Sequence, residues 1–94
     1  MNFIVFWEYD PDELEKVVRR LKKFEKEIKK NPSKYPKMTF GPYLFGGESK
    51  GITVCDIEDD EQPVNFHLYF QAELKMSFVP IVEVDTALEL ISQK

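Results

Sequence analysis

The chain has 94 residues, of which 43% are hydrophobic, 14% aromatic and 32% charged, and its formal net charge is −4 at pH 7. This length predicts a single domain over residues 1–94, and the aromatic content is too high for a disordered acidic chain. The negative charge argues against general binding to nucleic acid or to anionic membranes, since both need a basic surface. No apolar stretch approaches the roughly 20 residues that a membrane span needs.

The single cysteine, Cys55, and the N-terminal residues together favour a cytoplasmic location. One cysteine cannot form an internal disulfide, and a small domain without disulfides is typical of a reducing compartment. The first nine residues are apolar but lack a basic leader and a small-residue cleavage site, so they predict a strand and not a signal peptide.

Residues 2–9 are aromatic and β-branched, which predicts a first strand, and Asp10-Pro11 then predicts the start of a helix. Apolar residues recur at spacings of three and four and predict one buried helix face, made of Leu14, Val17, Val18, Leu21, Phe24 and Ile28. Because Leu21 is central to this face, we expect its truncation to alanine to leave a cavity and to cost about 2 to 4 kcal/mol. Asn31-Pro32 predicts the end of the helix.

The same helix carries a run of lysine and arginine residues that has two readings. A nucleic-acid patch would need a net basic face, but Glu15, Glu25 and Glu27 interrupt the run. The favourable pairs Glu15/Arg19 and Glu25/Lys29 indicate a solvated helix surface instead.

The segment 31–38 is broken by prolines and predicts a surface connection to a second strand over residues 39–45. Gly41-Pro42 within that strand predicts a bulge or an edge position. The glycine-rich residues 46–51 then predict a hairpin to a third strand over residues 52–58. A phosphate-binding loop is the alternative, but such a loop joins a strand to a helix N-terminus.

The acidic residues 58–61 precede Pro63, which predicts a second helix over residues 63–74. Binding of a divalent cation by this acidic run is the alternative to capping, and we favour capping because carboxylates are attracted to a helix N-terminus. Residues 76–84 predict a fourth strand, at an edge or with a bulge because of Pro80. Asp85 is expected to cap a short terminal helix.

This order predicts an α+β fold, a ferredoxin-like βαββαβ sandwich with a short C-terminal helix. Helices of one chain can cover one sheet face only. Strand one, however, is apolar on both sides, with Ile4 and Phe6 on one side and Phe3, Val5, Trp7 and Tyr9 on the other. We therefore expect a second copy of the chain to shield the remaining face, as an obligate homodimer.

The strand ending in Trp7, the motif Tyr9-Asp10-Pro11, the sequence Phe45-Gly46-Gly47 before a hairpin and the closing residues 78–83 form one pattern. It resembles an uncharacterised prokaryotic family of small dimeric α+β barrel domains. The resemblance implies two ferredoxin-like sheets that face each other across a two-fold axis, with a cleft between them. Related barrels include cofactor-independent monooxygenases, isomerases and effector-binding domains, so the fold does not select a chemistry.

Two residues are candidates for chemistry. His67 is the only histidine, but it lies within the predicted second helix without a second titratable residue at a motif spacing, which favours a structural role. Cys55 lies among β-branched residues and is expected to be a small buried strand residue. No catalytic residue is assigned, and no metal-ligand spacing or cofactor motif is present.

Trp7 and Tyr9 are the stronger candidates for binding, because they end a strand on a face that the resemblance turns toward the cleft. Packing in an interface core is the alternative. The candidate ligand-binding set is Trp7, Tyr9, Val5, Phe3 and His67, for a small apolar or aromatic molecule. Two hypotheses remain: a homodimer that binds a small molecule between its sheets, and a cofactor-independent enzyme, monooxygenase- or isomerase-like, that uses the same cleft.

Overall fold

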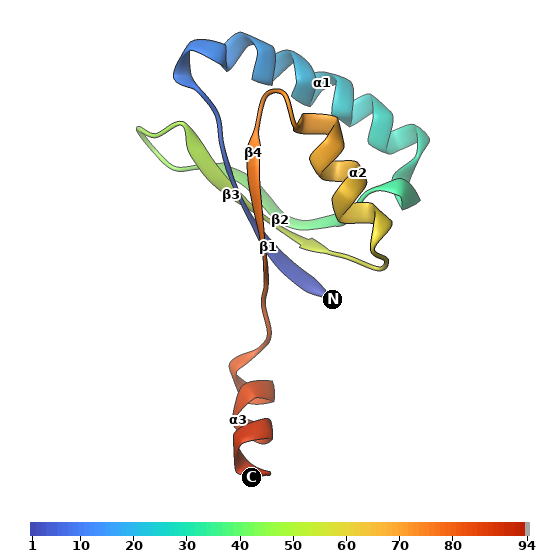
Figure 1. The fold of residues 1–94 in the computed structure, drawn as a ribbon, viewed down its shortest axis with the longest axis vertical. Coiled ribbons are helices and arrows are strands. Elements are labelled where there is room, and N and C mark those ends of the chain that lie inside the picture. Colours follow the sequence, from blue (N-terminus) through green and yellow to red (C-terminus); the bar gives the residue numbers. More distant parts are fainter. Residues whose placement is uncertain (94) are drawn as a thin grey trace.

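A computed structural model of the chain describes residues 1–93. In chain order its regular elements are β1 (Asn2–Glu8), α1 (Leu14–Lys30), β2 (Lys37–Leu44), β3 (Lys50–Asp56), α2 (Glu61–Phe70), β4 (Lys75–Pro80) and α3 (Val84–Ser92). Short 3-10 turns at Pro11–Glu13 and Pro32–Lys34 flank α1. The predicted α+β class and the short C-terminal helix are confirmed (Figure 1). Within the described residues no helix has the length and apolar character to cross a membrane.

The four strands form one antiparallel sheet in the order β2-β3-β1-β4. The predicted hairpin is confirmed, so its glycine turn joins β2 to β3 and not a strand to a helix. β2 is an edge strand whose register shifts on both sides of Phe40. Gly41 has a φ of +86°, and a Cβ there would lie 2.9 Å from the carbonyl oxygen of Ile52, so the irregularity requires glycine.

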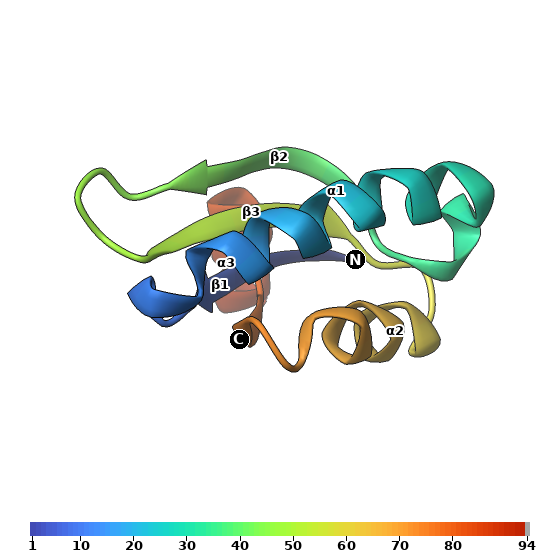
Figure 2. The same ribbon diagram turned by 90° about the horizontal axis from the view of Figure 1, so that it is seen from above.

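An aspartate side chain accepts backbone hydrogen bonds ahead of each helix that covers the sheet. The Oδ1 atom of Asp10 accepts a hydrogen bond of 2.9 Å from the backbone N–H of Asp12 and so caps the 3-10 turn that leads into α1. Asp59 Oδ1 accepts from the N–H groups of Glu61 and Gln62, both at 3.0 Å, so the acidic run does cap α2. The two helices are neighbours in both views (Figure 1, Figure 2).

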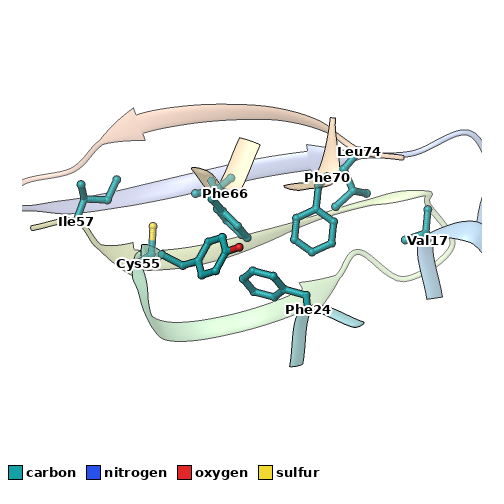
Figure 3. Packing of buried hydrophobic residues seen from close by; sticks show 9 residues of the cluster. Val17, Phe24, Cys55, Ile57, Phe66, Phe70 and Leu74 are labelled. Carbon is teal, nitrogen blue, oxygen red and sulfur yellow. The ribbon is translucent and has the colours of Figure 1, made fainter. Parts of the chain in front are cut away.

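The core lies between these two helices and one face of the sheet. Phe24 of α1 packs against Tyr35, Phe66 and Phe70 with ring centroids 5.0 to 5.4 Å apart. Figure 3 shows these α1 and α2 rings directed toward one another over the strands. Val5 of β1 and its β3 neighbours Thr53 and Cys55 are also buried. The core face of β1 is therefore that of Phe3, Val5 and Trp7.

The opposite face of the sheet is apolar as well, and no part of the described chain covers it. Register pairs place Ile4 opposite Val54 and Val79, and Phe6 opposite Ile52 and Ser77. We call this the open face. Its apolar side chains are Ile4, Phe6, Phe40, Tyr43, Ile52, Val54, Val79 and Ile81. The predicted double-sided apolar character of strand one is confirmed.

Several element boundaries differ from the sequence-based ones for local reasons. α2 begins at Glu61 and not at residue 63, because Asp59 caps it. β4 ends at Pro80 because its partner β1 begins at Asn2. The backbone N–H of Ile81 donates to the carbonyl oxygen of Asn2, and β1 does not extend beyond this point. For the same reason β3 ends at Asp56. Asp85 does not cap α3; it lies within the first turn, after Glu83.

Candidate functional site

An open groove of about 370 Å³ runs between α1 and the strands β1, β2 and β3. Its outer wall is formed by Leu14, Val18 and Leu21 of α1, whose side chains are 38% to 49% exposed. Half of the predicted buried helix face is therefore exposed at this groove, and only Val17 and Phe24 of α1 are fully buried. The expectation that Leu21 fills a closed core is wrong.

The floor of the groove is set by the pairing of β1 with β3. Trp7 and Gly51 are register partners, and a Cβ at Gly51 would lie 2.5 Å from Cζ2 of the indole. The ring of Trp7 thus lies against a backbone position that only glycine leaves free. Its Nε1–H donates a hydrogen bond of 3.1 Å to Oγ1 of Thr53, which is almost fully buried.

The remaining lining is apolar. Met38, Pro42 and Leu44 of β2 form the side that faces α1, and Tyr9 lies in the same lining after the end of β1. Among all the lining residues only Glu25 carries a charge at neutral pH, and its side chain is exposed. None of the described lining residues is a cation, so they offer no counter-charge to an anionic ligand. Its chemistry fits an uncharged apolar or aromatic molecule.

The sequence-predicted site residues are brought together only in part. Trp7 and Tyr9 line the groove. Val5 is completely buried in the core and Phe3 packs against it, and neither lines the groove. His67 is exposed on α2 and also lies outside it.

The face of β1 that carries Trp7 is the helix-covered face, because its side chains pack with the core cluster. A cleft lined by Trp7 and Tyr9 therefore belongs to one chain and lies between the sheet and α1. The space between two facing sheets would instead be lined by the open face, which carries Ile4 and Phe6. The sequence-based expectation had assigned Trp7 to the inter-sheet space, since strand alternation alone does not say which side the helices cover.

Two residues that contact the Trp7 ring, Gly51 and Thr53, were not singled out from the sequence. Their importance depends on the register between β1 and β3, which is a non-local property. A weak signal existed, because a threonine in a largely apolar strand needs a hydrogen-bond partner if it is buried.

Titratable groups in the core are held in their neutral or paired forms and do not face the groove. Burial, followed by the charge of Asp56, raises the pKa of Cys55 to about 11, which fits the predicted inert strand residue. The Tyr35 hydroxyl donates to Glu27, and burial together with this bond raises the pKa of Tyr35. Among residues 1–93 no group of three His, Cys, Asp or Glu side chains is placed to hold a metal ion.

The fold and the groove define a small α+β domain with an apolar pocket next to its longest helix. The chain belongs to a family described as a domain of unknown function, DUF3303, whose family model matches residues 1–94. No curated protein and no solved structure matches the chain significantly. The family description assigns no activity.

Proposed function

We propose that this domain binds an uncharged, apolar or aromatic small molecule in the groove beside α1. The main support is the size and lining of the groove, which has a volume of about 370 Å³ and is bounded by aliphatic and aromatic side chains. Ligand pockets of proteins have volumes of about 300 to 1,000 Å³ and are lined mostly by apolar side chains with a few polar groups. The exposed leucine and valine side chains of α1 lose contact with water when such a molecule enters, which favours binding.

Trp7 supplies a direct reporter for this proposal, since it is the only tryptophan and lines the groove. The uncharged probe N-phenyl-1-naphthylamine absorbs where tryptophan emits. We expect saturable energy transfer from Trp7 to the probe. Val18→Phe places a ring in the groove and should weaken binding at least about tenfold, which corresponds to about 1.4 kcal/mol.

The matched control is Val64→Phe. Val64 is an exposed valine of α2 that does not line the groove, so the same substitution there should leave probe binding unchanged. Absence of saturable transfer in the wild-type protein, or equal binding by both variants, would refute the groove as the site.

We infer further that the domain is a homodimer in which each copy covers the open face of the other. The strand order β2-β3-β1-β4 is compatible with the ferredoxin-like sandwich that the sequence predicted. The support for a partner is the exposure of large apolar side chains on the open face, with Phe6 44%, Phe40 53% and Tyr43 57% exposed. Patches of this kind on soluble proteins are typical of interaction sites. Sedimentation equilibrium at micromolar concentration tests this: a species near twice 11.1 kDa is expected, and a folded 11.1 kDa species would contradict it.

The enzymatic alternative uses the same groove with His67 as acid or base. The position of His67 outside the groove lining does not favour it. A catalysed reaction lost in His67→Ala, with the fold unchanged, would favour the enzyme over the binding domain.

The cytoplasmic location stays a prediction that rests on the single free thiol of Cys55. Fractionation of cells that produce the tagged protein tests it: recovery with the cytoplasmic fraction is expected, and recovery with an exported fraction would contradict it.

A further inference from the structure

The C-terminal helix α3 does not join the core of its own chain. Its apolar stripe consists of Val84, Leu88 and Ile91, which follow one another at spacings of four and three, and these side chains are 56% to 73% exposed. No residue of α3 is buried. Figure 1 places the helix beyond the end of the sheet opposite α1. A nine-residue helix is too short to be stable in water by itself, so it needs a surface to pack against.

The surface of the chain exceeds that of a compact monomer. Its accessible area is 7024 Å², whereas a compact protein of 11.1 kDa exposes about 5,700 Å². Its radius of gyration is 15.1 Å, compared with about 12.4 Å for a compact domain of this length. The excess area, roughly 1,300 Å², is more than the roughly 800 Å² that each partner buries in a stable interface.

We propose that α3 is an exchange arm that packs its apolar stripe on the open face of a second copy of this chain. This inference rests on the proposed homodimer. Each copy offers one exposed arm and one uncovered apolar face, so a two-fold pair satisfies both needs at once. The link between β4 and α3 stays extended, with Glu83 at φ −65° and ψ 143°, and it carries the arm away from its own sheet.

A membrane surface is the other occupant that an amphipathic helix could have, and the charges disfavour it. Helices that lie on membranes carry lysine and arginine on their polar side. The polar side of α3 carries Asp85 and Glu89, and the whole chain has a net charge of −4. The acidic polar side is compatible with solvent exposure at the rim of a protein interface.

The arm is tested with a pair of variants that add the same charge to the same helix. Leu88→Glu places a carboxylate in the apolar stripe, whereas Thr86→Glu places one on the other side of α3. Because neither residue is buried in its own chain, both variants should fold, as circular dichroism can verify. In sedimentation equilibrium we expect Leu88→Glu to raise the dimer dissociation constant at least tenfold, and Thr86→Glu to change it less than twofold.

If the arms are exchanged reciprocally, two different variants should complement each other. Leu88→Glu disrupts the arm and leaves the open face unchanged, whereas Phe6→Asp leaves the arm unchanged and disrupts the open face. A mixture of the two should form a heterodimer with one intact contact, which native mass spectrometry resolves by mass. An arm that packs on its own sheet gives no such complementation, so a mixture without excess heterodimer would overturn the proposal.

These experiments distinguish the proposal of an exchanged arm from the proposal of a homodimer. If the wild-type protein is a monomer, the homodimer and the arm both fail. A dimer that is equally stable in Leu88→Glu and wild type overturns the arm alone. Loss of the dimer in Leu88→Glu only, together with complementation, supports the arm. Wild-type protein that sediments with vesicles of anionic phospholipid, and a Leu88→Glu variant that does not, would assign α3 to membranes and overturn the proposal.

Discussion

The indole N–H of Trp7 donates a 3.1 Å hydrogen bond to the hydroxyl of Thr53, and this bond crosses from β1 to β3 on the floor of the groove. It fixes the orientation of the ring that a ligand would meet. The bond also leaves the neighbouring apolar surface free of an unpaired donor, which would otherwise weaken the binding of an apolar molecule.

Thr53→Val removes the acceptor of this bond while keeping the shape of the side chain. We expect the free energy of unfolding to fall by about 1 kcal/mol, because the indole donor loses its partner in a partly buried site. Urea denaturation measures the loss, and the emission of Trp7 should change in the folded protein. Thr86→Val, at an exposed position, is the control. Equal stability of Thr53→Val and wild type would show that the hydrogen bond between Trp7 and Thr53 does not stabilise the fold.

Phe24 and Leu21 lie one turn apart on α1 and differ in their surroundings. Phe24 is 5% exposed and packs against four aromatic rings, so Phe24→Ala should cost about 3 to 5 kcal/mol or prevent folding. Leu21 borders the open groove, so Leu21→Ala creates no closed cavity and should cost at most about 1.5 kcal/mol. Urea denaturation of both variants checks this, and similar losses would mean that the groove is closed in solution.

Glu27 accepts hydrogen bonds from the hydroxyl of Tyr35 and from Asn31, and these bonds and nearby lysines hold the pKa of Glu27 below its ordinary value. The charged form is thus favoured in the folded protein. Its contribution is complete above the ordinary pKa of a glutamate and is lost as the pH falls through the lowered value.

We therefore expect Glu27→Gln to destabilise the domain at pH 7 and to lose this disadvantage below about pH 4. Urea denaturation of wild type and variant at several pH values between 7 and 3 measures the difference. A difference that does not depend on pH would show that the carboxylate charge has no role.

Val5 and Phe6 are adjacent in β1 but point to opposite faces, which makes them a matched pair. The sequence placed Val5 among the candidate ligand-binding residues, but Val5 is fully buried in the core of its own chain. Val5→Asp should unfold the monomer, because it buries an unpaired carboxylate. Phe6→Asp should leave a folded chain that no longer dimerises. Circular dichroism and sedimentation equilibrium distinguish the two results, and a folded Val5→Asp would contradict the assignment of faces.

The elements that the sequence predicted well are those with local causes. Asp10-Pro11 and the spacing of Val17, Phe24 and their neighbours define α1, and the glycines at 46, 47 and 51 define the hairpin. Alternation in β1 correctly indicated two apolar sheet faces.

The groove could not be predicted in the same way, because it depends on how far α1 lies from β2 and on which face of β1 the helices cover. A stripe of leucine and valine is the same whether it borders a closed core or an open groove. Trp7 and Tyr9 were identified by residue type, but Thr53 and Gly51, the partners of Trp7, come from a strand more than 40 residues away in the sequence. His67 was considered only because of its chemistry, and its exposed position follows from the rotation of α2.

Native mass spectrometry of the protein purified under non-denaturing conditions tests the ligand-binding claim most directly. We expect the wild-type chain to carry a small apolar molecule. The Val18→Phe variant should lose this bound molecule, and the Val64→Phe variant should retain it. A wild-type chain that has only its own mass, and that fails to take up N-phenyl-1-naphthylamine when the probe is added, would contradict the account.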